Sequence, residues 1–251
     1  ENRPPMIAHA AHITTPAARL HSIHSAPAHT KTLHFIRHAQ GTHNVKNEYR
    51  APAHFDAPLT PLGMEQCRLL SQTCSTELDV ECIISSPLTR ALQTAKLCFD
   101  GVAHPEGGIP LIACEHWRET VNFLSDVRRE TGFLRTEFPH VDFKYLVHDD
   151  DPIWAKYEDK FGDHTEYESI RESGDGIALE KRTRAAWKFV AERPEKSIAI
   201  VSHSAFFMHM FTPHFEELEG IVSYEDTDVQ WLMTSSQFEN CELRSAAFEV
   251  P

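Results

Sequence analysis

The chain has 251 residues and a mass of 28.6 kDa, which suits one large globular domain or a domain core with insertions. Hydrophobic residues form 41% of the sequence and aromatic residues 10%, so a wholly disordered chain is excluded. With 24 Lys and Arg against 37 Asp and Glu the net charge is −13, and this negative field makes nucleic acid a poor partner. An anionic ligand can bind such a chain only where a few arginines and histidines converge and reverse the sign of the field.

The cysteines and the hydropathy pattern bear on the compartment. None of the six cysteines forms a CxxC pair and most lie in apolar periodic segments, so we expect buried thiols in a reducing compartment. No run of about 18 consecutive apolar residues occurs, which predicts that the chain does not span a membrane. The sequence starts at Glu1 rather than Met, which suggests a processed or truncated start, and a cytoplasmic location is the default expectation. No pattern indicates an oligomeric state.

Residues 1–30 are rich in Ala, Pro and His and lack the sustained hydrophobicity of an independent core. We expect a polar N-terminal arm here, followed by a single domain over residues 31–251. Two His-x-x-His spacings, His9 with His12 and His21 with His24, raise weak metal binding as an alternative. Such spacings are common by chance without a Cys or carboxylate framework, so we expect no metal site in the arm.

From residue 31 to about residue 114 the pattern alternates strands with helices. An apolar run that contains Leu33, Phe35 and Ile36 predicts a strand ending in Arg37-His38. Four more elements follow: a helix from the N-cap Thr60 and Pro61 to about Leu78, a strand over Val80–Ser85, a helix from Ser86-Pro87 through Phe99 that carries Arg90 in its first turn, and a strand over Leu111–Cys114.

The second half of the chain starts with an acidic and aromatic segment, at about residues 120–175, that we expect to be an irregular insertion folding over a site. A helix over about Gly176–Arg193, a strand over Ser197–Ser202 and a short helix over Phe206–Phe211 are predicted next, and residues 228–249 are predicted to form one or two hairpin strands. Alternating strands and helices predict an α/β fold, a three-layer α/β/α sandwich with a mostly parallel central sheet.

Three predicted strands end in polar residues that suit phosphate chemistry. One ends in Arg37-His38, one ends just before Arg90, and one ends in Ser202-His203. Because the carboxyl ends of parallel strands meet at one edge of a sheet, we expect two arginines and two histidines to converge there. Taken singly, each residue is better explained by an ordinary ion pair or a buried imidazole, but the joint pattern favours a shared site.

The residue types at this edge suit a phosphoryl group. Arg37 and Arg90 can each present paired N–H donors to phosphate oxygens and stay charged at any relevant pH. A neutral imidazole is a good nucleophile, and with an ordinary pKa of about 6.5 one ring can stay neutral while its neighbour is protonated. The other internal histidines match no required role and are expected to be structural: His34, His43, His54, His209 and His214.

The motifs HFIRHAQGTHNV, SSPLTRALQTA and IAIVSHSAF, in this order over roughly residues 33–211, resemble the histidine phosphatase superfamily in its phosphoglycerate mutase-like branch. RHAQGTHNV, LTPLGMEQC and EHWRE are most similar to the phosphoglycerate mutase-like proteins of plants and fungi. The resemblance implies that His38 is phosphorylated on a ring nitrogen, that Arg37, Asn44, Arg90 and His203 bind the phosphoryl oxygens, and that no metal or cofactor is needed. Many family members carry Gly-Glu where this chain has Ala39-Gln40.

A general acid must protonate the leaving oxygen, and Glu115 and Glu119 are the two candidates. Family members place this Glu just past the third strand, often two residues after a large apolar residue. Trp117-Arg118-Glu119 fits that register better than Glu115 does, so we prefer Glu119.

These features predict a phosphatase that acts on a small phosphorylated metabolite or, as an alternative, on a phosphoprotein. A phosphoglycerate-type mutase and a non-catalytic phosphate-binding protein are the other hypotheses. Mutases usually need extra cations for a substrate carboxylate, whereas the insertion is acidic and carries Asp149, Asp150, Asp151, Glu158 and Asp159, with Lys156, Lys160 and Arg171 nearby. This acidity favours hydrolysis over transfer.

Overall fold

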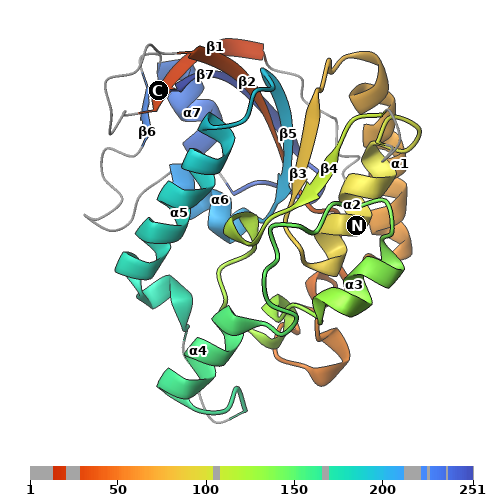
Figure 1. Ribbon diagram of the computed structural model, residues 1–251, viewed down its shortest axis with the longest axis vertical. Coiled ribbons are helices and arrows are strands. Elements are labelled where there is room, and N and C mark those ends of the chain that lie inside the picture. Colours follow the sequence, from red (N-terminus) through yellow and green to blue (C-terminus); the bar gives the residue numbers. More distant parts are fainter. Residues whose placement is uncertain are drawn as a thin grey trace, which may run out of the picture.

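The structure is a computed structural model that describes residues 14–20, 29–103, 108–165, 170–211, 222–224, 227–235 and 237–250. Helices cover both faces of one sheet, which confirms the predicted three-layer α/β/α sandwich (Figure 1). The seven strands of this sheet lie in the order β4-β3-β5-β2-β7-β1-β6. Their bounds are β1 Thr14–Leu20, β2 His29–Arg37, β3 Cys82–Ser85, β4 Leu111–Ala113, β5 Ser197–Ser202, β6 Val222–Tyr224 and β7 Leu243–Val250.

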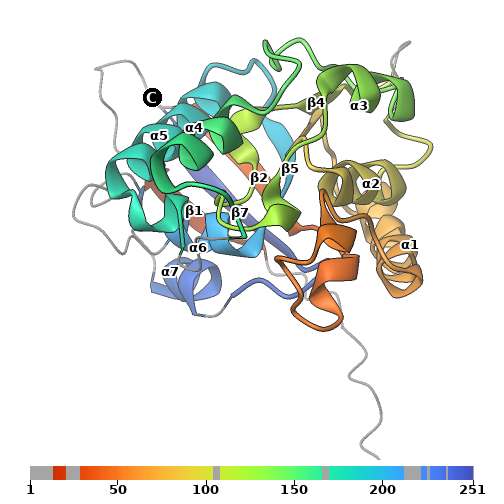
Figure 2. The same ribbon diagram turned by 90° about the horizontal axis from the view of Figure 1, so that it is seen from below.

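Strands β4, β3, β5 and β2 are parallel neighbours, so their carboxyl ends share one edge of the sheet. The register pairs Arg37 of β2 with Ser202 of β5, and Ser85 of β3 with Val201 of β5. Strand β7 continues the sheet antiparallel to β2 and parallel to β1, and β6 is antiparallel to β1. Figure 2, seen from below, looks onto the carboxyl edge, with residues 42–54 (orange) beside it.

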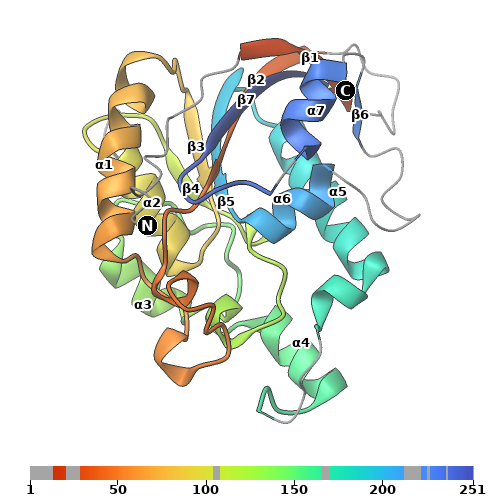
Figure 3. The same ribbon diagram turned by 180° about the vertical axis from the view of Figure 1, so that it is seen from behind.

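Side chains alternate between two buried cores, one on each face of the sheet. Leu33 and Phe35 point into one core, whereas Ile36 points into the other. Helices α5, α6 and α7 cover the first face and α1, α2 and α3 the second (Figures 1 and 3). Their bounds are α1 Pro61–Thr76, α2 Thr89–Cys98, α3 Thr131–Glu137, α5 Gly176–Ala191, α6 Ser204–Phe211 and α7 Thr227–Thr234.

Two helix starts can be compared with the sequence-based prediction. Thr60 caps α1, because its Oγ1 accepts a hydrogen bond from the Gly63 N–H at 3.0 Å, and Pro61 follows as predicted. The predicted start of the next helix at Ser86-Pro87 is wrong, since α2 begins at Thr89. The Asp56 carboxylate accepts from the Thr89 N–H at 2.8 Å and from its hydroxyl, and so satisfies the first turn of α2 in place of a serine cap.

The predicted hairpin over residues 228–249 is also wrong. Residues 227–234 form helix α7, and only Leu243–Val250 is a strand. Val229, Leu232 and Met233 are buried, with the i, i+3, i+4 spacing of one helical face, while Trp231 is 67% exposed. The other strand and helix ends differ from their predicted positions by at most a few residues.

The insertion at about residues 120–175 is more ordered than predicted. It contains α3 and α4 (Pro152–Phe161), and α4 lies beyond the carboxyl edge of the sheet (Figures 1 and 3). A buried ion pair between Arg118 and Asp151, at 2.7 Å, joins the segment after β4 to the start of α4. The same Asp151 caps α4 by accepting from the Ile153 and Trp154 N–H groups.

Part of the predicted N-terminal arm belongs to the sheet, because Thr14–Leu20 is strand β1. Residues 1–13 and 21–28, with the His-x-x-His spacings, lie outside the described residues, and the division into an arm and a domain stays a prediction. Five cysteines are buried and Cys241 is half-buried, all as free thiols. Among the helices that the structure describes, none has the length and apolar character needed to cross a membrane.

Gly63 permits a close approach of its own backbone to that of Gln40, two residues after His38. A Cβ at residue 63 would lie 2.3 Å from the carbonyl oxygen of Gln40, so the backbone must shift in Gly63→Ala. We expect the free energy of unfolding to fall by about 1–3 kcal/mol, measured by thermal or urea unfolding. The matched control is Gly174→Ala, because a Cβ there meets nothing within 4 Å. Equal stability of both variants would contradict this account.

Candidate phosphate site

Strand β2 delivers Arg37 and His38 to the carboxyl edge, and the neighbouring segments fix the backbone there. The His38 N–H donates to the Ser202 carbonyl of β5 at 2.9 Å. The His38 carbonyl accepts from the Cys241 N–H at 3.3 Å and from the Asn240 side-chain amide at 3.1 Å. Because both backbone groups are bonded, the direction of the His38 side chain is set by the sheet and by the turn before β7.

The His38 ring is 2% exposed and has a defined tautomer. Its Nδ1 lies 2.7 Å from the Ala39 carbonyl oxygen, and a carbonyl can only accept, so we assign the proton to Nδ1. The lone pair of the neutral ring is then on Nε2, which accepts a hydrogen bond from Arg90 Nε at 3.3 Å. Ala39 keeps a negative φ, so the tight turn that family members make with Gly is compatible with Ala here.

Arg90 is 1% exposed in the first turn of α2. One terminal nitrogen donates to the Ser125 carbonyl at 2.5 Å, and the other lies 3.2 Å from the Asp126 carboxylate. The guanidinium is therefore held by the insertion on one side while its Nε points at His38. A buried charge with a single ionic partner and a fixed orientation is suited to receive an anion.

His203 follows β5, and its ring centroid lies 5.0 Å from that of His38. Its Nε2 lies 2.8 Å from the Ser86 hydroxyl. Two buried nitrogens of the site, His203 Nδ1 and Arg37 Nε, have no hydrogen-bond partner within the described part of the chain. Arg37 also donates from a terminal nitrogen to the Phe238 carbonyl at 2.6 Å. These two nitrogens are therefore available to a ligand at this edge of the sheet.

Burial and the two guanidiniums set the charge of the histidines. Burial first, then Arg90, lower the pKa of both His38 and His203 well below the ordinary range, and the same causes lower the pKa of His43 to about 2. The sequence predicted one neutral and one protonated ring, whereas these environments favour neutral rings. The reason is that burial disfavours a charged imidazole, and the charges of Arg90 and Arg37 act in the same direction on both rings.

The two candidate carboxylates have different surroundings. Glu115 is ion-paired with Arg128 at 2.6 Å and with Arg118 at 3.3 Å. Glu119 Oε1 accepts from the Thr120 N–H at 2.8 Å and, at the start of α6, from the Phe206 N–H at 2.9 Å. Burial, then the charge of Asp126, raise the pKa of Glu119, with Arg90 acting against them.

Asn44 lies in a short helical turn after His38, Thr42–Asn44. Its side-chain oxygen accepts from the Gly41 N–H at 3.0 Å, which leaves the amide nitrogen to donate to a ligand. The structure thus brings His38, Arg90 and His203 into direct contact around one edge, with Arg37 adjacent.

Sequence reasoning missed several residues that build this site. Ser86, which follows β3, bonds His203. Ser125 and Asp126 of the insertion hold Arg90, and no periodicity marks them in the sequence. His43 was assigned a structural role, yet its ring lies 5.7 Å from that of His38. Of the other histidines, His34 bonds Ser245 and His54 bonds Thr42, His209 is buried, and His214 lies outside the described residues.

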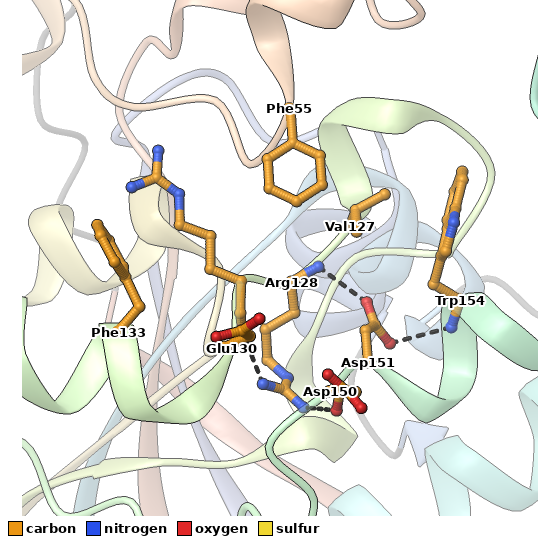
Figure 4. A pocket seen from close by; sticks show the side chains of 9 residues that line it. Phe55, Val127, Arg128, Glu130, Phe133, Asp150, Asp151 and Trp154 are labelled. Atoms are coloured by element: carbon orange, nitrogen blue, oxygen red, sulfur yellow. Dashed lines mark hydrogen bonds between the residues drawn. The ribbon is translucent and has the colours of Figure 1, made fainter.

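A separate pocket of about 360 Å³ lies along the segment that follows Asp126 (Figure 4). Phe55, Val127 and Trp154 form apolar walls, and the phosphate-site residues do not line it. Two of its polar side chains are bonded within the chain: Arg128 donates to the carbonyls of residues 148–150, and Asp151 accepts from the Arg128 and Trp154 N–H groups (Figure 4). This pocket is therefore distinct from the phosphate site.

The buried neutral His43 generates a prediction about acid stability. The pKa of His43 is about 2 in the folded chain and about 6.5 in the unfolded chain. As the pH falls below 6.5, His43 is therefore protonated in the unfolded chain and stays neutral in the folded chain. Stability from this source is present above pH 6.5 and is lost toward lower pH, at about 1.4 kcal/mol per pH unit. In His43→Gln we expect a slope smaller by that amount between about pH 4 and about pH 5.5, measured by urea unfolding. Equal slopes would rule out a neutral buried His43.

Three comparisons with known proteins agree with this geometry. The sequence profile of the histidine phosphatase superfamily (branch 1) matches residues 33–123. A phosphoglycerate mutase-like protein of Arabidopsis thaliana is 32% identical over 86% of this chain and 83% of its own. A Schizosaccharomyces pombe protein named a probable phosphatase is 30% identical over 69% of this chain and 74% of its own. The solved ecdysone phosphate phosphatase of Bombix mori, in complex with tungstate, shares the fold, with a TM-score of 0.54 and 15% identity over 86% of this chain and 88% of its own. The chain therefore belongs to the histidine phosphatase superfamily, in its phosphoglycerate mutase-like branch.

Proposed function

We propose that this chain hydrolyses phosphomonoesters through a phosphohistidine intermediate on Nε2 of His38. Its class, a phosphatase, follows from the family and from the phosphatase-named relative of similar length. The observation that carries the mechanism is the 2.7 Å contact between His38 Nδ1 and the Ala39 carbonyl, because it fixes the proton on Nδ1 and leaves the Nε2 lone pair beside Arg90.

In the first step, the Nε2 lone pair attacks phosphorus as the bond from phosphorus to the leaving oxygen breaks. The lowered pKa of His38 keeps the nucleophile neutral and available at physiological pH. In the free site, the Nε–H of Arg90 donates a hydrogen bond to His38 Nε2. As the anion enters, Arg90 keeps this proton and donates the hydrogen bond to a phosphoryl oxygen instead. Arg37 Nε, His203 Nδ1 and the Asn44 amide supply further donors, and the charge of the anion raises the pKa of His203 back toward its ordinary range.

Glu119 is the proposed general acid. Two backbone N–H groups occupy its Oε1, so the proton sits on Oε2, and burial beside Asp126 raises its pKa as an acid requires. The proton passes from Oε2 to the leaving oxygen. Glu115 is less suited to this role, because two arginines hold its carboxylate.

In the second step a water molecule attacks the phosphorus of phosphohistidine. The Glu119 carboxylate takes a proton from that water, the bond between phosphorus and Nε2 breaks, and inorganic phosphate leaves with His38 neutral again. The cycle restores every group and consumes one water.

A small phosphorylated metabolite is the substrate class that the site favours over a phosphoprotein. His38, Arg90 and His203 are each at most 2% exposed, so the phosphate must enter deeply, which a small ester does more readily than a side chain of a folded protein. A mutase needs cations that bind the carboxylate of its substrate. Lys156 and Lys160 of the insertion instead pair with Asp175, at 3.9 and 3.5 Å, so hydrolysis is favoured over mutase chemistry.

The covalent intermediate is directly testable. After incubation with a phosphomonoester and an alkaline quench, which preserves phosphohistidine, we expect mass spectrometry to find a phosphoryl group on His38. His38→Ala should lose this adduct and release of inorganic phosphate, while still folding.

A phosphate panel assayed beside 3-phosphoglycerate isomerisation separates the alternatives. Isomerisation faster than phosphate release would replace the phosphatase proposal with a mutase. Phosphate binding without turnover, or full turnover in His38→Ala, would refute the mechanism.

The choice of general acid generates a paired prediction. Glu119→Gln should lower kcat/KM for alkyl phosphates by about 10² to 10⁴, and less for nitrophenyl phosphate, whose leaving group needs little protonation. Glu115→Gln removes a partner of two buried arginines, so we expect lower stability, by about 1–3 kcal/mol, with kcat/KM nearly unchanged. A large rate loss in Glu115→Gln with none in Glu119→Gln would reverse the two assignments.

A further inference from the structure

A cluster of cysteines lies behind the phosphate site and has no part in the proposed mechanism. The sulfur atoms of Cys67, Cys98 and Cys241 all lie within 4.8 Å of one another. They come from three separate elements: Cys67 from α1, Cys98 from α2, and Cys241 from the turn before β7. Three thiols from remote parts of the chain therefore converge on one point.

The surroundings of the cluster suit a largely closed site. Cys67 and Cys98 are at most 1% exposed, whereas Cys241 is half-buried. Cys74, a further buried thiol of α1, lies beside Cys98.

The backbone at Cys241 is a second, independent observation. Cys241 has a φ of 62°, in the left-handed region that glycine and asparagine usually occupy. A cysteine held there costs of the order of 1 kcal/mol or more and persists only where the surroundings require it. Here the strained residue directs its sulfur into the cluster.

We propose that Cys67, Cys98 and Cys241 form a binding site for a thiophilic cation of the Zn²⁺ or Cu(I) class. Soft thiolate ligands select these ions over Mg²⁺ or Ca²⁺. Binding forms three metal–sulfur bonds and releases the protons that the three thiols still carry, with no change of oxidation state. Cys74, whose thiol interacts with that of Cys98, is the candidate for the fourth sulfur that tetrahedral zinc prefers.

A cation bound at this site would cross-link the elements that position the proposed catalytic groups. Helix α2 carries Arg90, and the turn at residues 238–242 bonds both Arg37 and His38. The Glu242 carbonyl accepts from the Arg37 N–H at 3.1 Å, and the Cys241 N–H donates to the His38 carbonyl at 3.3 Å. The proposed metal site would thus have a structural role next to the phosphate site. The proposal does not depend on the proposed phosphatase activity.

The test is a Cd²⁺ and Zn²⁺ titration of the full chain, kept reduced with a phosphine. We expect one equivalent of Cd²⁺ to produce the ultraviolet thiolate charge-transfer band, and one equivalent of Zn²⁺ to raise the Tm and to resist exchange into a chromophoric chelator. Cys241→Ser and Cys67→Ser should lose this equivalent. The matched control Cys114→Ser changes a buried cysteine outside the cluster and should keep it.

Three outcomes would overturn the proposal: no thiolate band with Cd²⁺, an unchanged stoichiometry in Cys241→Ser, or equal loss in Cys114→Ser. Because the readout is metal content and Tm, it does not depend on turnover. Cys74→Ser separates two coordination numbers, since a weaker but still stoichiometric band indicates four sulfurs and an unchanged band indicates three.

Discussion

The site depends on the buried charge of Arg90. A guanidinium that is 1% exposed needs ionic and hydrogen-bonded partners, and Asp126 and the Ser125 carbonyl supply them from the insertion. Asp126 is itself buried, and burial raises its pKa. Arg37 and Arg90 both act on the two imidazoles of the site, and Asp126 is the carboxylate that pairs with Arg90 among the described residues. The two guanidiniums thus form a local cationic region in a chain of net charge −13, and a phosphate anion would complement it.

Packing of the sheet fixes where the charged groups of the site lie. Phe35 in the middle of β2 contacts the rings of Trp117, Trp187 and Phe211 with centroids 6.5, 6.2 and 4.9 Å away, so β2 cannot slide in register without emptying the core. Arg37 and His38 come directly after this anchored segment. The position of His38 is therefore set by aromatic packing around Phe35, and only its last hydrogen bonds are local.

The sequence predicted the parts of the site that follow from strand ends, and it failed where contacts are long-range. Arg37, His38 and His203 follow unmistakable apolar runs, and one rule of parallel sheets brings them together. Asp126 carries no such signal, because its contact with Arg90 spans 36 residues and lies in a segment without periodicity. In residues 228–249 the hydrophobic positions fit both the two-residue period of a strand and the 3.6-residue period of a helix. Helix α7 is decided by the burial of Val229 and Met233, which no single sequence displays.

Glu115 and Glu119 show how packing separates two residues that sequence treats alike. They are four positions apart in one irregular segment, and the register after β4 favours one of them only weakly. Arg118 and Arg128 form ion pairs with the Glu115 carboxylate, whereas Glu119 accepts two backbone N–H groups, and burial and then the charge of Asp126 raise its pKa. A general acid must carry a proton to the leaving oxygen, so an environment that disfavours the ionised carboxylate suits that role. In the proposed mechanism, the two arginines that bind Glu115 keep this second carboxylate engaged in ion pairs, and Glu119 is left to transfer the proton.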